Sequence, residues 1–350
     1  MIWAFCLKSV FLISLLSFFF YSLLFLEKFQ LSLVQRSFFF QRNKTLARSP
    51  LFSNLLKSLF KKSSFHYSSE QSLSVALSLI AFLFAIYPFF VLPFFSDKDF
   101  SNILLMPEFI KVPLPLFTFL ISPILGLFPL LIDTWLCGDS PSYLSVVRQL
   151  LSRLTSFVVL FFLVLSSMFL YKTADFHTLV LAQQNKMFLS LPSWGIFTQP
   201  LGAIIFSILI TLFFSGIGHY GFSSTKENDP LLGRYRHNDA LSYYIFKLAD
   251  HFFYMGLLFL FVFLFLGGYS SFFTFSDSLT SSNWFLLIQI LSLFIKVALT
   301  HCVHLWISFA IPTLKWSLSV KMPLTVLFPL SLCNLICTLL WLYTYKDVSL

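Results

Sequence analysis

The chain has 350 residues with a mean hydropathy of +0.86, and 58% of them are apolar while only 11% are charged. Because an ordinary soluble domain has roughly a quarter of its residues charged, this composition excludes a soluble globular domain and a disordered chain. The 23 Lys and Arg exceed the 14 Asp and Glu, which gives a formal net charge of +9. In so apolar a chain, we expect this positive charge to meet anionic lipid headgroups rather than nucleic acid.

A transmembrane helix needs about 20 predominantly apolar residues, and the chain contains eight runs of that kind. They cover roughly residues 9–26, 74–95, 114–136, 150–171, 197–218, 241–268, 284–309 and 322–344. No small-residue cleavage site follows the first run, which ends before Glu27, so we expect it to be a helix rather than a signal peptide. The sequence predicts an all-α polytopic membrane protein of about eight transmembrane helices, formed by a single integral membrane domain over residues 1–350.

Basic residues are distributed unevenly over the connections between these runs. Fifteen of the 23 Lys and Arg lie in or beside the odd-numbered connections, and four lie in the even-numbered ones. By the positive-inside rule, the odd connections face the cytoplasm or the matrix, and both termini face the opposite side.

The first connection, residues 27–73, is long and basic. Within residues 49–62, apolar side chains such as Phe52 and Leu56 recur at helical spacing opposite lysines. This pattern is typical of an amphipathic helix lying in the membrane interface. It either serves as a surface anchor or borders the mouth of a tunnel for a lipid-soluble substrate.

The fifth connection, residues 219–240, concentrates ionisable side chains, including the acids Glu227, Asp229 and Asp239. Two interpretations have equal standing. The segment is either a solvated loop of mixed charge, or a polar vestibule or docking face for a soluble partner.

Three ionisable residues fall within or near the ends of the predicted spans. An ionised Lys296 near the middle of the seventh span costs at least about 2.5 to 3.5 kcal/mol unless it is paired or hydrated, so we expect it to face protein or water. Asp250 opens the sixth span beside Lys247 and His251, where it either complements the helix dipole or has a functional role. Asp133, near the end of the third span, is expected to be an interfacial cap.

The sequence shows no motif of a redox or catalytic centre. It has no phosphate-binding glycine loop, haem-ligating pattern, nucleophile elbow or pair of catalytic carboxylates. Its five cysteines are odd in number, scattered and without CxxC spacing, which indicates neither a disulfide framework nor a metal site. We therefore expect no catalytic residue, no covalently bound cofactor and no metal in this chain.

Four stretches in chain order carry a family resemblance. They are Leu26-Glu27-Lys28 with Gln35-Arg36; Trp194 to Gly202 with Gln199-Pro200; Leu248-Ala249-Asp250-His251 running on to Phe265-Leu266-Gly267-Gly268; and Lys296, Trp306, Pro312, Lys315 and Pro329. Together they resemble a highly divergent member of the NADH dehydrogenase subunit 1 family of respiratory complex I, whose bacterial members are the H-type subunits.

The resemblance implies a membrane subunit of NADH:ubiquinone oxidoreductase that has no redox centre of its own. Such a subunit forms part of the quinone-access tunnel and links the peripheral redox arm to the proton-pumping membrane arm. Ubiquinone is the substrate and the iron–sulfur cluster belongs to a partner subunit. The expected partners are the other membrane and peripheral-arm subunits and anionic lipids such as cardiolipin, in the mitochondrial inner membrane or, alternatively, the bacterial cytoplasmic membrane.

The resemblance also assigns site residues in two groups. The quinone-binding group is Glu27, Lys28, Gln35, Arg36, Phe52, Leu56 and Arg148. The proton-path group is Asp250, Lys296, Glu227, Asp229 and Asp239.

The chain departs from the family pattern in its carboxylates. The family's acid-rich stretch after helix five is largely missing, and the glutamate expected early in helix four falls near Phe157. Proton coupling through this chain is therefore open, and a degenerate scaffold subunit is one alternative. A membrane subunit of a related proton-pumping hydrogenase is another. An independent transporter is disfavoured because the two halves of the sequence show no internal symmetry.

Overall fold

The computed structural model describes residues 2–34, 68–94, 112–136, 138, 140–185, 192–217, 240–270, 283–310 and 316–344. Almost all of these residues are helical. The elements are α1 (Ile2–Val34), α4 (Ser68–Val91), α5 (Pro115–Leu125), α6 (Phe128–Leu136), α7 (Ser140–Tyr171), α8 (Phe176–Gln183), α9 (Gly195–Thr198), α10 (Pro200–Ile217), α12 (Ala240–Phe265), α14 (Asn283–Ala310), α15 (Trp316–Met322), the π-helical turn η3 (Pro323–Leu327) and α16 (Phe328–Thr344).

The described helices confirm the all-α polytopic prediction. Six stretches in the described part of the chain are long and apolar enough to cross a membrane. They are Ser72–Val91, Pro115–Leu136, Ser142–Tyr171, Leu241–Phe265, Leu287–Ala310 and Val320–Thr344. Two shorter apolar stretches, Leu12–Glu27 and Pro200–Phe213, lie where the first and fifth spans are predicted.

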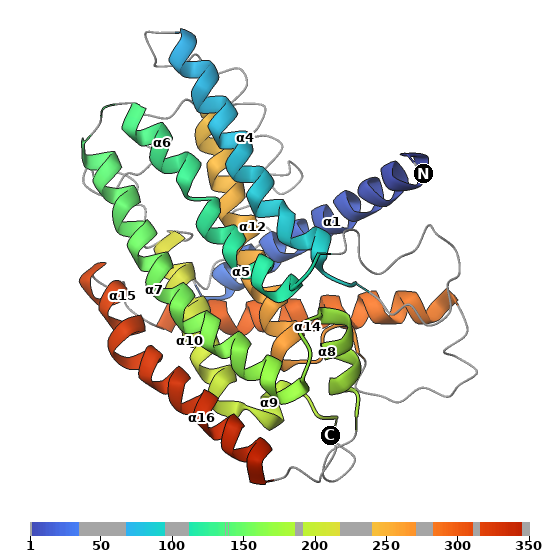
Figure 1. The fold of residues 1–350 in the computed structure, drawn as a ribbon. Coiled ribbons are helices and arrows are strands. Elements are labelled where there is room, and N and C mark those ends of the chain that lie inside the picture. Colours follow the sequence, from blue (N-terminus) through green and yellow to red (C-terminus); the bar gives the residue numbers. More distant parts are fainter. Residues whose placement is uncertain are drawn as a thin grey trace.

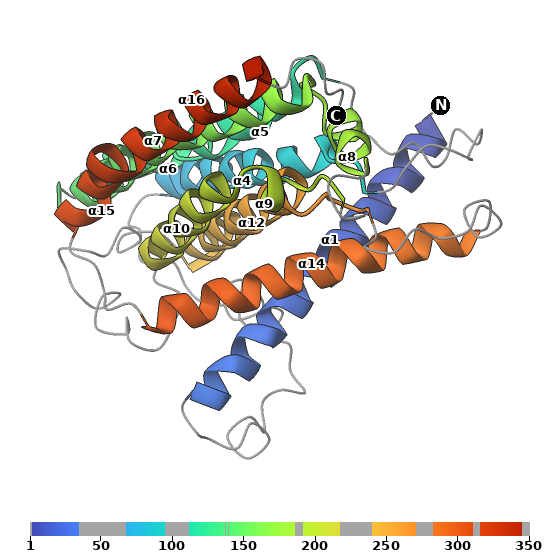
Figure 2. The same ribbon diagram turned by 90° about the horizontal axis from the view of Figure 1, so that it is seen from below.

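Helix α12 is the centre of the bundle. In its apolar stretch, 89% of the residues are buried, against 22% to 50% in the other five long stretches. A helix that is apolar on all sides is expected to be buried, and the aromatic rings of α12 pack outward in several directions. The Phe259 ring, for example, contacts Phe19 of α1, Phe89 of α4 and Phe94 beyond α4. In Figures 1 and 2, the neighbouring helices accordingly surround α12.

The outer helices are arranged on two sides of this core. Helix α16 runs along α7 in both views, and α1 and α14 cross each other against another side of α12 (Figures 1 and 2). The span predicted over residues 322–344 is not one regular helix. Pro323 has no backbone N–H to donate, and a π-helical turn begins at this residue before α16.

Two predicted helix boundaries are wrong. Helix α1 continues to Val34 instead of ending near residue 26, so Glu27 lies inside a helix, where it is 3% exposed. Helix α7 begins at Ser140, ten residues before the predicted start, so Arg148 lies on a helix and not in a connection. In both places, charged residues suggested a loop although their side chains are turned toward protein.

Candidate functional site

A buried ion pair joins α7 to α12. The guanidinium of Arg153 donates a hydrogen bond to the Asp250 carboxylate, with 2.6 Å between Nη2 and Oδ1, and both side chains are about 95% buried. The guanidinium also lies over the rings of Phe213 and Phe253, at 4.8 and 5.5 Å from their centroids. The pair and the aromatic rings compensate for removing both charges from water.

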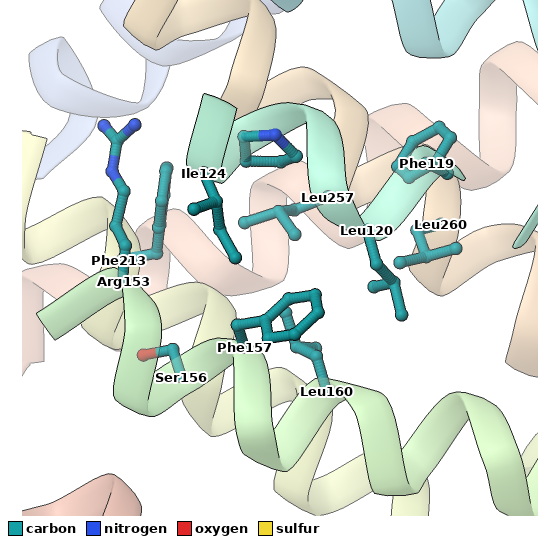
Figure 3. Close-up of a pocket in the computed structure, with 11 residues that line it drawn as sticks. Phe119, Leu120, Ile124, Arg153, Ser156, Phe157, Leu160, Phe213, Leu257 and Leu260 are labelled. Carbon is teal, nitrogen blue, oxygen red and sulfur yellow. The ribbon is translucent and has the colours of Figure 1, made fainter. Parts of the chain in front are cut away.

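A small cavity lies beside the ion pair, between α5, α7, α10 and α12. Its volume is about 30 Å³, which is room for one or two water molecules. Figure 3 shows Arg153 and Ser156 at one edge and the Phe157 ring in the middle, facing Leu257 of α12. The resemblance expects a glutamate near Phe157, and the wall of the cavity at this position is an aromatic ring.

Two sequence interpretations of acidic residues are corrected here. Asp250 lies ten residues inside α12, opposite Arg153, and therefore does not complement a helix start. Asp133 is not an interfacial cap, because it lies within α6 and is only 1% exposed.

Lys296 of α14 holds the chain that follows α12. Its Nζ donates three hydrogen bonds to the carbonyl oxygens of Leu266, Gly268 and Ser270, at 2.6, 2.9 and 2.6 Å. Nζ also lies 4.2 Å from the ring centroid of Trp194. Three carbonyls need three N–H donors, which the ammonium form has and the neutral amine lacks. The expectation that Lys296 faces protein is confirmed, and it does not snorkel to the interface.

The loop that presents these carbonyls depends on two glycines. Gly267 and Gly268 have φ values of +70° and +53°, a region that L-residues with side chains rarely occupy. A Cβ on Gly267 would lie 2.6 Å from the Trp194 indole nitrogen, and one on Gly268 would lie 2.8 Å from Val180. The left-handed turn ends α12 and directs its terminal carbonyls toward α14, where the negative end of the helix dipole favours a cation.

The same end of α12 is tied to α8, and two nearby amides bind α7. The Gln183 amide of α8 donates to the carbonyl oxygen of Leu264 at 2.8 Å. Near α10, the Gln199 amide donates to the Ser166 carbonyl of α7 at 3.1 Å, and Asn334 of α16 donates to the Ser166 hydroxyl at 3.0 Å. These buried amides fix α7, α10 and α16 around the Trp194-to-Gly202 stretch.

A second buried polar contact joins α12 to α14. Tyr254 Oη lies 3.0 Å from Nδ1 of His301. Glu27 of α1 interacts electrostatically with Tyr254, and Asp250 lies one helical turn before it on α12. Of the predicted site residues, Asp250 therefore lies on the same face of α12 as this tyrosine, and Glu27 is buried on α1.

Of the other predicted site residues, two have described side chains and the rest do not. Arg148 is partly buried on α7, and Lys296 binds the loop after α12, away from the Arg153 pair. Several predicted residues lie outside the described residues, as does the side chain of Lys28: Gln35, Arg36, Phe52, Leu56, Glu227, Asp229 and Asp239. Their assigned roles stay predictions.

Sequence reasoning missed four polar residues of the bundle interior, Arg153, Tyr254, His301 and His304. Arg153 was counted among the cations of a connection. Tyr254 and His304 had a detectable signal, since Tyr254 follows Asp250 by four residues and His304 follows Lys296 by eight, which places each pair on one helix face. The residues on other helices that these side chains contact had no signal in the sequence.

The NADH dehydrogenase family model matches residues 7–339 of the chain. The chain belongs to this family. The H-type subunit of NADH-quinone oxidoreductase from Bacillus cytotoxicus is 25% identical over 289 residues, which cover 82% of this chain and 78% of the relative. The proteins of the same name from Bacillus thuringiensis and Bacillus cereus are each 22% identical over the same coverage. The predicted family resemblance is thereby confirmed, and it agrees with a multi-pass membrane protein.

Proposed function

We propose that this chain is the H-type membrane subunit of an NADH:quinone oxidoreductase and has no redox centre of its own. The observation that carries the proposal is the family match over residues 7–339, together with the names of the relatives. The apolar helical bundle supports it, because such a bundle offers a lipid-soluble carrier a route that a soluble enzyme cannot.

The finer part of the proposal concerns the quinone. Glu27, Lys28 and Arg148, with Gln35, Arg36, Phe52 and Leu56 of the first connection, border the tunnel through which ubiquinone reaches an iron–sulfur cluster in a partner subunit. The burial of Glu27 near the end of α1 supports a polar group at the start of this connection. A quinone needs an apolar groove for its tail and a few polar groups for its headgroup.

Sidedness and location follow from charge. The odd connections lie on the cytoplasmic or matrix side and meet the peripheral redox arm, while anionic lipids such as cardiolipin meet the basic first connection. The chain has 49 Phe, which is typical of coding bias in a T-rich genome such as an organelle's and favours a mitochondrial inner membrane. The bacterial relatives favour a bacterial cytoplasmic membrane.

A second candidate, a scaffold subunit that does not conduct protons along the predicted path, has a specific observation in its favour. The Asp250 carboxylate accepts a hydrogen bond from Arg153, and the three N–H donors of Lys296 bond to carbonyl oxygens. Unchanged proton pumping in Asp250→Asn and Lys296→Met complexes that assemble normally supports the scaffold, and loss of pumping with retained assembly supports the proton path.

The test of the proposed function is purification from the native membrane. The tagged chain is extracted in mild detergent, and the attached proteins are identified by mass spectrometry. We expect iron–sulfur and NADH-oxidising subunits, with NADH:ubiquinone activity sensitive to quinone-site inhibitors. A chain that purifies alone contradicts the proposal, and a nickel-binding partner replaces it with the hydrogenase alternative.

A further inference from the structure

Two cysteines lie on one exposed face of α16, outside the candidate site described above. Cys333 and Cys337 are four residues apart in this helix, so their side chains are neighbours on its surface. Both are free thiols on exposed residues. The residues around them on the exposed surface are apolar: Leu330, Ile336 and Leu340 are 38%, 53% and 58% exposed. The helix therefore presents two thiols together in an apolar surface.

The packing of α16 against α7 fixes the direction in which the thiols face. Asn334 donates a hydrogen bond to the Ser166 hydroxyl of α7 at 3.0 Å. Ser331 and Thr338, on the same side of α16 as Asn334, are only 0% and 6% exposed. These contacts turn one face of α16 toward α7, and the exposed cysteines are turned away from it. In Figures 1 and 2, α16 accordingly lies on the outer side of α7.

The exposed face of α16 belongs to a membrane-spanning stretch. Within Val320–Thr344, 22% of the residues of the apolar window are buried, the lowest share among the six long stretches of the described part of the chain. The surroundings of the two thiols are therefore lipid hydrocarbon. Because this medium admits apolar molecules far more readily than ions, a reagent for the pair has to be apolar and uncharged.

The spacing of the pair favours a bridging atom over a direct disulfide. Side chains four residues apart on a helix have Cβ atoms about 5 to 6 Å apart. A disulfide needs a Cβ–Cβ distance of about 3.5 to 4.5 Å. One atom placed between the two sulfurs lengthens the link and removes this conflict.

A metal cation fits the pair poorly. A structural zinc site takes four ligands, and no three His, Cys, Asp or Glu side chains of the described residues come together as a metal-binding group. A cation also needs both thiols as thiolates and brings its own charge into the hydrocarbon. The class that remains is a neutral, sulfur-seeking electrophile that takes two thiols at one atom.

We propose that Cys333 and Cys337 form a dithiol site for trivalent organic arsenicals that dissolve in the membrane. In the reaction with phenylarsine oxide, two As–S bonds form and both S–H bonds break. The two protons leave with the arsenic-bound oxygen as one water molecule, so no charge is left in the hydrocarbon. Arsenic stays trivalent and no electron is transferred. The site does not rest on the proposed function, because neither cysteine is among the quinone-binding or proton-path residues.

The experiment uses the native complex in liposomes, with phenylarsine oxide as the probe. After treatment with the arsenical, N-ethylmaleimide alkylates the free thiols, and mass spectrometry of this chain identifies the cysteines that were protected. Before alkylation, one sample is washed with excess glutathione, a monothiol, and another with 2,3-dimercaptopropanol, a dithiol. The strength of binding is the arsenical concentration that protects half of the thiols.

The variants separate a bridged pair from single reactive thiols. Cys333→Ser and Cys337→Ser each leave one thiol of the pair. Leu330→Cys combined with Cys333→Ser keeps two thiols on the exposed surface but places them seven residues, or about 10 Å, apart along the helix. The matched control is Cys302→Ser, which removes a half-buried cysteine of α14.

We expect both cysteines to be protected in the native and Cys302→Ser complexes. This protection should survive glutathione and be reversed by 2,3-dimercaptopropanol. Because the second As–S bond forms within one molecule, loss of either thiol should weaken binding by at least about a hundredfold. The combined variant, whose thiols are too far apart for one arsenic atom, should bind as weakly as the single variants.

Three results would overturn the site. They are alkylation of both cysteines in the treated native complex, binding of native strength in an assembled single variant, and equally strong binding by the combined variant. A chain that purifies without electron-transfer partners contradicts the proposed function only, because the arsenical then tests the same two thiols on the chain by itself.

Discussion

Replacing Lys296 by Met removes the ammonium that holds the loop after α12 and keeps an unbranched side chain. Three hydrogen bonds to a charged donor are lost, at about 1.5 to 3 kcal/mol each. The change also removes the cost of placing a charge in the membrane interior, about 2.5 to 3.5 kcal/mol. We therefore expect Lys296→Met to lower the free energy of unfolding by about 1 to 6 kcal/mol.

Thermal unfolding of the purified complex in detergent, followed by differential scanning calorimetry, measures this loss. A loss of this size lowers Tm by about 2 to 12 °C. The control is Lys247→Met. Lys247 is partly buried, and its Nζ donates to the Tyr243 hydroxyl at 3.2 Å on the same helix. That variant should stay within about 0.5 kcal/mol of the native protein.

The combination of stability and activity distinguishes a clamp from a proton carrier. If Lys296 only holds the loop after α12, Lys296→Met lowers Tm. Complexes kept below the new Tm then retain their proton uptake per NADH. A Lys296→Met complex with native Tm and lost proton uptake refutes the reasoning, because the ammonium would then move protons without stabilising the loop.

Three further outcomes follow from the geometry. Asp250→Asn leaves the buried Arg153 guanidinium without its carboxylate and should cost about 3 to 5 kcal/mol in the same thermal assay, whereas Arg153→Met combined with Asp250→Leu should recover most of the loss. Gly267→Ala should cost about 1 to 3 kcal/mol, because it strains a backbone with φ of +70° and presses a methyl group on Trp194; a native Tm would contradict this. Asn334→Leu should cost about 0.6 to 2 kcal/mol through the lost interhelical hydrogen bond, and its full effect should vanish in a Ser166→Ala background.

The apolar runs predicted the bundle well because membrane spanning is a local property of composition and length. Helix ends were harder to predict. Glu27 and Arg153 suggest solvent when read along the chain, yet each lies on a helix and is turned toward protein. A charged residue indicates a connection only when no residue on another helix pairs with it. Such a pairing residue lies far away in the sequence.

The same limit applies to the candidate site. Lys296 was singled out because a lone cation in an apolar span demands a partner, and the structure supplies three carbonyls from a loop 26 to 30 residues earlier. Sequence alone could not identify carbonyls as ligands, because every residue has one. Arg153 and Asp250 are 97 residues apart, and no periodicity relates them.

The most direct test of the central claim is electron transfer in membranes that lack this chain. NADH oxidation is measured with ubiquinone and with a soluble artificial acceptor that takes electrons before the quinone step. We predict that deleting the chain abolishes inhibitor-sensitive ubiquinone reduction, that the artificial-acceptor activity of the remaining soluble subunits persists, and that re-expression restores the quinone reaction. Native rates of ubiquinone reduction without the chain would contradict the account.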